Sequence, residues 1–303
     1  MSLSGVLAPT NDARPDVKVS QVSVPLFRNP LLENQLDRYF DPTLNYVMPD
    51  INTLPRADAV QLRARQICES NNSNLEVECR AMAVAEIGKP SVLQVNIMGG
   101  GGNGSGFAID PAEIFWREPP QNGDFYVLTC EHVTEGAEVN VLTKDGVLFD
   151  NVEVVEQTFG SEPEDMALLL VHNNGKIPPP SSPIAQLDTL SVGSMVFSIG
   201  SPLGLKGTFT AGFVSYIGER PEFGPGQWIQ FDAATNQGNS GGPIFTTNGE
   251  IAGIVRLFAQ DAQGHKAEGI NVASDVRAGI VALFYAAQER LRTKESPPSF
   301  TDS

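Results

Sequence analysis

The strongest candidate for chemistry in this sequence is the hydroxyl of Ser240, in the stretch TNQGNSGGPIF from Thr235 to Phe245. Glycines on both sides of the serine predict a tight turn, where no neighbouring side chain blocks a substrate. They also allow the backbone N–H groups of Gly238 and Ser240 to point together, as in a hole that stabilises the oxyanion of an attacked carbonyl. The alternative is a glycine-rich hairpin turn with a surface serine, because the pattern is short and common.

Two further segments predict a base and a carboxylate at strand ends. Residues 126–133, YVLTCEHV, are typical of a buried strand followed by a polar turn that holds His132. Residues 163–171, PEDMALLLV, place Asp165 immediately before a continuous apolar run, which predicts a second buried strand. With Ser240, the candidates follow in the order His, Asp, Ser, which is the order of chymotrypsin-type proteases. The other histidines, His172 and His265, are expected at the surface, the first in a turn and the second in a polar loop.

Five motifs follow one another along the chain: GSGFAI at 104–109, TCEHV at 129–133, EDMAL at 164–168, SIGSPLGL at 198–205 and QFDAATNQGNSGGP at 230–243. Together they resemble the protease domain of the HtrA (DegP-like) branch of trypsin-fold serine proteases, over about residues 85–291. Five motifs in register are far more specific than any one of them. The resemblance implies a serine endopeptidase, with a role in protein quality control.

The resemblance also implies a role for each candidate. His132 is the general base for the Ser240 hydroxyl, Asp165 fixes the tautomer of the histidine, and the N–H groups of Gly238 and Ser240 hold the oxyanion. The reaction passes through an acyl-enzyme and requires no metal or cofactor. Gln237 stands where the family commonly has proline, which leaves open whether the oxyanion loop is formed or collapsed.

The primary specificity pocket is also implied by the resemblance. Ala234 stands at the position of the pocket floor and carries no charge. The residues expected along the pocket walls are Val255, Arg256, Leu257 and Ile270. We therefore expect cleavage after small or medium apolar residues such as Val, Ala or Leu. Two orientations of the Arg256 side chain stay open: outward, or across the pocket, where it would favour an acidic group.

The expected fold is all-β, with two six-stranded antiparallel β-barrels (the chymotrypsin or trypsin-like fold), an N-terminal helical extension and a C-terminal helix. The 29 glycines, the 22 prolines and a charged fraction of 18% suit short strands joined by tight turns. The expected parts are an N-terminal arm and helical hairpin at 1–85, a first barrel at 86–180, a second barrel at 181–273, and a C-terminal helix and tail at 274–303. The catalytic groups would then lie in the cleft between the barrels.

The sequence also predicts three helices. Residues 56–69 and 75–87 form the hairpin, whose loop is flanked by Cys68 and Cys79; one disulfide and two free cysteines are both open. Cys130 is expected to be a small buried residue. The last helix begins near residue 274 and carries an apolar stripe that we expect to pack on the second barrel. The stripe comprises Val276, Ile280, Leu283, Phe284, Ala287 and Leu291.

Composition limits the partners. The formal net charge is −16, from 36 acidic and 20 basic residues without a basic cluster, so nucleic acid is not expected as a partner. No apolar stretch is long enough to span a membrane, and the N-terminus lacks a signal-peptide pattern, so we expect a cytoplasmic protein or the mature form of an exported one. The expected partners are polypeptide substrates and, by family analogy, a homo-oligomer such as a trimer. We expect no PDZ module.

Residues 1–55 predict an arm that either wraps the protease domain or is partly disordered, with a regulatory or assembly role as a further option. Two other function classes stay open. The first is a catalytically silent or autoinhibited trypsin-fold binding or chaperone module, against which the complete set of three catalytic residue types argues. The second is a protease that cuts mainly itself or one dedicated partner, with residues 1–85 as substrate or inhibitor.

Overall fold

The computed structural model describes residues 54–71, 75–134, 137–158, 165–186, 189–220, 223, 226–260 and 266–293, with the backbone alone at 257–260 and 266. Nearly all of the predicted N-terminal arm lies outside these residues, as do His265 and the side chain of Leu257. Within the described part of the chain, no helix is long and apolar enough to cross a membrane.

Two helices joined by a disulfide precede the sheets. They are α2 (Arg56–Asn71) and α3 (Glu76–Gly88), within two residues of the predicted bounds. Cys68 and Cys79 form the disulfide, which was one of the two alternatives left open by the sequence. Both helices bury apolar side chains in the main core cluster, which also contains residues of the first sheet. The hairpin therefore shares its core with the strands that follow it.

The first sheet has seven strands in the order β5-β4-β1-β2-β3-β7-β6, with antiparallel neighbours throughout. The strands are β1 Val92–Ile97, β2 Gly102–Ile109, β3 Phe125–Thr129, β4 Val139–Thr143, β5 Leu148–Phe149, β6 Val152–Gln157 and β7 Ala167–Val171. β3 and β7 pair along their whole length, and nearly all their side chains are buried. Burial on both faces explains their continuous apolar sequences.

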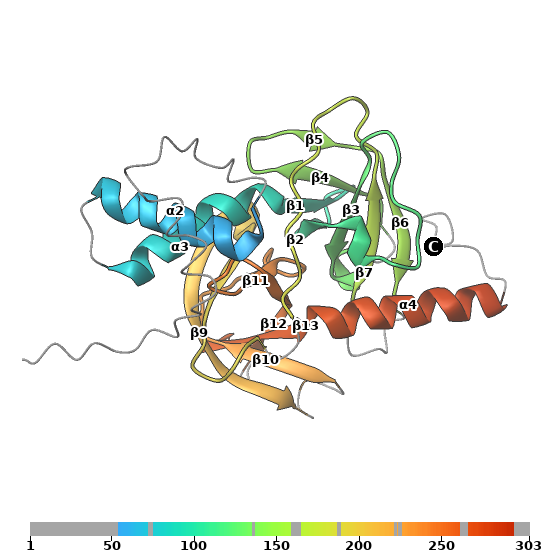
Figure 1. Ribbon diagram of the computed structural model, residues 1–303. Helices are drawn as coiled ribbons and strands as arrows, with labels where there is room; N and C mark the ends of the chain where they lie inside the picture. The colour runs from blue at the N-terminus through green and yellow to red at the C-terminus, as the bar shows by residue number, and fades with distance from the viewer. Residues whose placement is uncertain are drawn as a thin grey trace, which may run out of the picture. The chain divides into compact units, whose positions relative to one another are not determined.

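The second sheet closes on itself as a six-stranded barrel in the order β10-β13-β12-β11-β8-β9. The strands are β8 Met195–Gly200, β9 Thr208–Glu219, β10 Gln227–Phe231, β11 Pro243–Phe245, β12 Ile251–Gln260 and β13 Lys266–Asp275. Its interior holds a second core cluster, with Phe231, Ile244 and Val255 among the buried residues. Figure 1 shows the first sheet in green and the barrel in yellow to red.

The predicted all-β class, with helices at both ends, is confirmed, and the first sheet differs in detail. In place of a closed six-stranded barrel it has seven strands, and its hydrogen-bonded order ends at β5 and β6. The additional strand is β5, whose two residues pair only with β4 after the turn at Lys144–Gly146. A strand of two residues has no periodicity of its own, so the sequence pattern does not predict it.

The two sheets meet through β1, β2 and β8. The proline-rich segment between them also pairs with both: Ser182 bridges to Ile109 of the first sheet, and Ile184 bridges to Ile251 of the second. Arg56 of α2 donates hydrogen bonds to the carbonyl of Ser181, at 2.8 Å, and to that of Ile87, at 3.1 Å. The connection between the sheets is therefore held in place by backbone pairing and by α2.

The C-terminal helix α4 (Val276–Thr293) contacts β12 and β13, as predicted, but also β6 of the first sheet (Figure 1). Leu291, which was expected on the packed face, is 69% exposed. Gly279 allows the helix to approach the side chain of Met166 closely, because a Cβ added at Gly279 would lie 2.0 Å from Cε of Met166. Since Met166 follows Asp165, α4 packs directly behind the start of β7.

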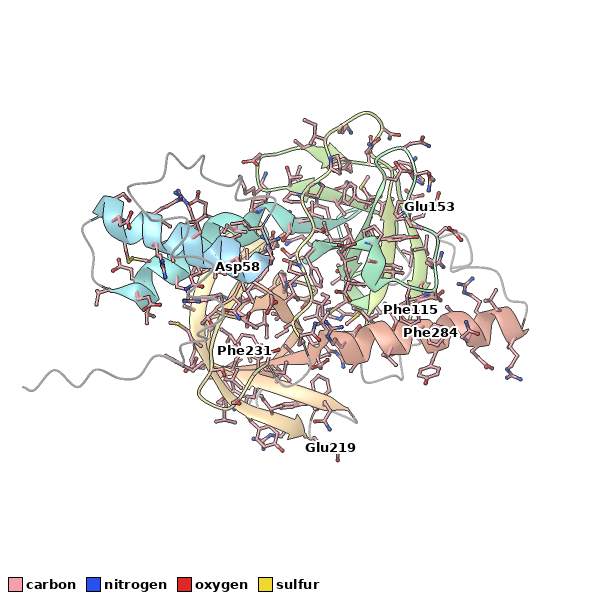
Figure 2. All side chains as sticks on the ribbon, in the orientation of Figure 1. Asp58, Phe115, Glu153, Glu219, Phe231 and Phe284 are labelled. Atoms are coloured by element: carbon pink, nitrogen blue, oxygen red, sulfur yellow. A yellow bond between two sulfur atoms is a disulfide. The ribbon has the colours of Figure 1, made fainter. Side chains whose placement is uncertain are left out.

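An aromatic cluster also fixes α4 to the first sheet. Figure 2 shows Phe115 and Phe284 side by side at this helix, and their ring centroids are 5.2 Å apart. The ring of Trp116 lies 5.6 Å from that of Phe284. The segment after β2 therefore packs on the helix.

His172 is not the surface turn residue that the sequence predicts. Its side chain is 25% exposed and lies between two carboxylates, with Nδ1 2.6 Å from Asp124 and Nε2 3.0 Å from Glu153. Hydrogen bonds from the ring to Glu153 and Asp124, and their negative charges, outweigh partial burial and raise the pKa of His172. Through these contacts His172, which follows β7, is connected to Glu153 in β6 and to Asp124 just before β3.

The raised pKa of His172 predicts a pH-dependent contribution to stability. The folded protein binds the proton more tightly than the unfolded chain, so the contribution is complete below about pH 6.5 and is lost as pH rises through the folded pKa. We expect His172→Gln to lower the free energy of unfolding more at about pH 5.5 than at about pH 8.5. Urea denaturation of both proteins at each pH measures the difference, and an equal loss at both pH values would contradict it.

Candidate active site

His132 and Asp165 meet because their strands are antiparallel neighbours. His132 lies in the short helix η5 (Glu131–Val133), just after β3, and Asp165 lies just before β7. β3 ends where β7 begins, with Thr129 opposite Ala167. Nδ1 of His132 lies 2.7 Å from Oδ2 of Asp165, and the backbone N–H of His132 donates to Oδ1 at 3.0 Å. The sheet topology therefore places both groups at one edge.

The Asp165 carboxylate is buried, and its backbone has a φ of +42°. A non-glycine residue in this left-handed region is uncommon and is often found at functional sites. Burial alone would raise the pKa of Asp165, but the hydrogen bonds and charge of His132, and the charge of Arg256, together lower it. The carboxylate is therefore ionised at neutral pH, and can only accept hydrogen bonds.

Ser240 lies in the turn that leads into β11 and is half-buried. Its hydroxyl donates a hydrogen bond to the backbone carbonyl of Arg256 at 3.0 Å, and none among the described residues joins it to His132. The Ser240 carbonyl accepts from the N–H of Ser105 at 2.8 Å, which connects this turn to the first sheet. The structure thus brings the histidine and the carboxylate into contact, with the serine hydroxyl in a separate hydrogen bond.

The carbonyls of the turn before Ser240 are fixed by its neighbours. The carbonyl of Gln237 accepts from the N–H of Leu203 at 2.8 Å, and that of Gly238 accepts from the hydroxyl of Ser105 at 2.7 Å. Gly238 has a φ of +98°, and a Cβ there would lie 2.5 Å from the Ser201 carbonyl, so only glycine fits. No hydrogen bond among the described residues uses the N–H of Gly238 or Ser240.

Ser105 and Leu203 were not among the predicted site residues, although they lie in the motifs at 104–109 and 198–205. Ser105 is fully buried, and its hydroxyl also accepts from the N–H of Ser201 at 2.9 Å. A buried serine with partners 96 and 133 residues away along the chain is connected by the fold and not by local spacing. The only feature of the sequence that could have indicated a role for Ser105 is its place between Gly104 and Gly106.

The residues predicted to form the specificity pocket have different environments. Ala234 is exposed, and its carbonyl accepts from the Thr210 hydroxyl at 2.9 Å. Ile270 is half-buried, whereas the Val255 side chain is 2% exposed and belongs to the core of the barrel. Val255 contributes its backbone, which exchanges hydrogen bonds of 2.8 Å with the two glycines after Ser240. The side chain of Leu257 lies outside the description.

The side chain of Arg256 points inward, which contradicts the outward orientation considered from the sequence. Its Nε donates to Oδ2 of Asp165 at 3.0 Å, and its guanidinium carbon lies 5.0 Å from the centroid of the Trp228 ring. The side chain is 17% exposed. It therefore points toward the predicted catalytic carboxylate, away from solvent.

Donor atoms of Cys130, His132 and Asp165 lie within 4.8 Å of one another, which is a spacing that a metal ion can use. The histidine nitrogen and the carboxylate already bond to each other, and the guanidinium of Arg256 brings a positive charge beside them. Burial, followed by the nearby Asp165, raises the pKa of the Cys130 thiol well above its ordinary value. These donors fit a hydrogen-bonded pair beside a neutral thiol better than a cation site.

Comparisons with known proteins cover the region of the chain that holds these residues. Residues 104–254 match the family model described as a trypsin-like peptidase domain. A putative serine protease HhoA of Synechocystis sp. is 35% identical over 175 residues, and a probable periplasmic serine endoprotease DegP-like of Marinomonas sp. is 36% identical over 183 residues. Each match covers 54% of this chain, and 39% and 37% of the two relatives.

A second Synechocystis protein, a putative serine protease HhoB, is 36% identical over 169 residues and is covered over 36% of its length. The chain thus spans less than two fifths of these relatives. The residues matched by the family model include His132, Asp165 and Ser240. Residues 104–254 therefore match a trypsin-like peptidase domain, and over this region the chain is similar to serine proteases of the HtrA and DegP-like branch.

Proposed function

We propose that the chain is a serine endopeptidase in which His132, Asp165 and Ser240 hydrolyse peptide bonds through an acyl-enzyme. The observation that carries the proposal is the 2.7 Å contact between Nδ1 of His132 and the buried Asp165 carboxylate. Because an ionised carboxylate accepts, Nδ1 carries the proton and Nε2 is left as the base. The His132 side chain is 46% exposed, so a substrate can approach that nitrogen.

In the proposed reaction, the Ser240 hydroxyl turns from the Arg256 carbonyl toward Nε2 of His132. Its oxygen bonds to the peptide carbonyl carbon while its proton passes to the imidazole. The imidazolium then protonates the leaving amine as the C–N bond breaks. Water, deprotonated by the same nitrogen, attacks the acyl-enzyme and frees Ser240. The carboxylate of Asp165 stabilises the imidazolium at both stages.

The N–H groups of Gly238 and Ser240 are proposed to hold the oxyanion. The hydrogen bond from Leu203 to the carbonyl of Gln237 supports an open hole, because the N–H of Gly238 points away from that carbonyl in a planar trans peptide. The N–H of Gly242 donates to the carbonyl of Asn239 at 2.8 Å, which holds the peptide that carries the Ser240 N–H in the same way. Fixed donors of this kind are worth about 3 kcal/mol each in related sites.

The proposed specificity is for small or medium apolar residues before the cleaved bond. It rests on the uncharged Ala234 and on Ile270, together with the backbone of residues 255–257. The guanidinium of Arg256 is occupied by Asp165, so it gives no support to an acidic preference. A role in protein quality control, implied by the resemblance, is part of this proposal, and faster cleavage of unfolded than folded protein substrates would support it.

Covalent labelling by a fluorophosphonate probe, measured by intact mass, tests the proposed activity. We expect one label on the wild-type chain and none on Ser240→Ala. Ser215→Ala, which removes an exposed serine of β9, is the matched control and should label like the wild type. Folded wild-type protein that takes no label would contradict the proposal.

One observation favours the second candidate, a silent or autoinhibited binding module: the Ser240 hydroxyl bonds to Arg256 and not to His132. We favour the active enzyme, because hydrogen bonds of catalytic groups are often long or misaligned before substrate binds. The labelling experiment separates the two candidates, since a silent module would leave Ser240 unmodified.

A further inference from the structure

Arg256 occupies a β-bulge at the edge of the active site. In the pairing of β12 with β13, Val255 lies opposite Ala273 and Leu257 lies opposite Val272, so Arg256 is an extra residue without an opposite partner. A bulge bends its strand and turns the extra side chain away from the regular alternation. Here the side chain leaves the barrel wall and reaches the first sheet, where Asp165 lies.

The guanidinium is held on two sides. Nε donates to Oδ2 of Asp165 at 3.0 Å, and the Trp228 ring lies beneath the group at 5.0 Å. Trp228 is 1% exposed and therefore has little freedom to move. A planar cation that stacks on a fixed aromatic ring loses little further entropy when it also bonds to a carboxylate.

The same carboxylate oxygen serves both neighbours. Oδ2 of Asp165 accepts from Nδ1 of His132 and from Nε of Arg256, while Oδ1 accepts from the backbone N–H of His132. Three donors fix the plane of the carboxylate, and hence the direction in which the imidazole is held. Meanwhile, the backbone carbonyl of Arg256 accepts from the Ser240 hydroxyl.

We propose that Arg256 is a positioning residue of the active site, which holds the Asp165 carboxylate with its side chain and the resting Ser240 hydroxyl with its backbone carbonyl. This proposal rests on the serine endopeptidase activity proposed above. It gives Arg256 a function different from lining a specificity pocket. It also makes the bulge in β12 a part of the catalytic architecture.

The positive charge of Arg256 has a second consequence. It repels a further positive charge on the neighbouring imidazole, so we expect that replacing Arg256 by a neutral residue favours protonation of that imidazole. Among the residues that the structure describes, the other titratable groups around His132 and Asp165 are Cys130, whose raised pKa keeps it neutral, and Glu131, whose carboxylate accepts from the Thr158 hydroxyl. Arg256 is thus the cation that the described contacts place on the Asp165 carboxylate.

The test compares Arg256→Met, Arg256→Lys and wild type in the full chain. The measured quantity is the rate constant of fluorophosphonate labelling from about pH 5 to about pH 10, which spans the range in which histidine titrates. The acid limb is the fall of this rate constant toward low pH. For Arg256→Met we expect its midpoint to rise by on the order of one pH unit, which makes the reaction roughly tenfold slower at pH values below both midpoints. Arg256→Lys keeps the charge, so its acid limb should stay near that of wild type.

Arg220→Met is the matched control, because Arg220 also stacks on an aromatic ring of the barrel, Tyr216 at 3.8 Å, and donates to the side chain of Gln230 in place of a catalytic group. It should leave both the acid limb and the rate unchanged. If Arg256→Met has the acid limb of wild type, or if Arg256→Lys shifts as far as Arg256→Met, Arg256 is not a positioning residue. Thermal melts identify any variant that is merely unfolded.

A second measurement keeps this inference separate from the proposed activity. Histidine-selective isotope labelling allows the imidazole titration of His132 to be followed by NMR, with His172 as an internal reference. We expect its midpoint to rise in Arg256→Met by the same amount as the acid limb. Wild-type protein that takes no label would overturn the proposed activity, whereas an unmoved titration midpoint would overturn the inference about Arg256.

Discussion

Asp165→Asn is expected to lower kcat/KM for peptide cleavage by about 10⁴-fold while the chain stays folded. In the proposed mechanism, the carboxylate holds the histidine in the tautomer whose Nε2 is a base. An amide in its place favours the opposite tautomer, because its N–H₂ group donates where the carboxylate accepted. Hydrolysis of an apolar peptide substrate, measured with the wild type and the variant at equal concentration, gives the ratio.

The amide in the Asp165→Asn variant could exchange its oxygen and nitrogen by a 180° rotation, but the contacts of Asp165 show that this rotation would not remove the clash between donors. At the Oδ2 position its nitrogen would face Nδ1 of His132 and Nε of Arg256, which both donate. At the Oδ1 position it would face the backbone N–H of His132. In both orientations the amide N–H₂ group therefore faces another hydrogen-bond donor, and the imidazole of His132 must rotate or change its tautomer.

The chain offers a close control in Asp124→Asn. Asp124 holds His172 through the same atoms, with Oδ2 2.6 Å from Nδ1, and its Oδ1 accepts from the backbone N–H of Asn173 at 2.9 Å. This pair lies at the other end of β3 and β7, away from Ser240. We expect it to leave kcat/KM within about twofold of wild type. Activity of Asp165→Asn at the level of this control would contradict the proposed triad.

The strands that carry the candidate triad could be predicted because their residues are apolar without interruption. β3 and β7 lie inside a sheet that is covered on both faces, so burial leaves a continuous signal in the sequence. The turn around Ser240 is equally local, since its glycines mark it directly. Motif order then indicates which of these elements belong to one site.

The contacts around that site could not be predicted, because they depend on pairing between distant segments. The bulge that directs Arg256 to Asp165 exists only in the register of β12 against β13. The partners of His172 stand 48 and 19 residues away along the chain, and nothing near His172 indicates them. The orientation of the oxyanion turn likewise depends on Ser105, from the other sheet.

A buried ion cluster gives the largest stability effect that we expect. Glu156 of β6 is 2% exposed in its side chain and accepts from Arg290 of α4 and from Arg117, the latter at 3.3 Å. Glu156→Gln keeps the shape but leaves two guanidinium groups partly buried without their carboxylate. Removing one partner of a buried ion pair costs about 3 to 5 kcal/mol of unfolding free energy. Urea denaturation of both proteins measures the loss.

Two further variants distinguish the buried charges from a general loss of hydrogen bonds. Glu289→Gln removes the carboxylate of an exposed pair with Arg292 on the same helix and should change the free energy of unfolding little. Adding Arg290→Met to Glu156→Gln removes one of the uncompensated charges, so the double variant should be more stable than Glu156→Gln alone. A double variant less stable than either single one would mean that α4 is held by packing around Arg290 and not by the charge balance at Glu156.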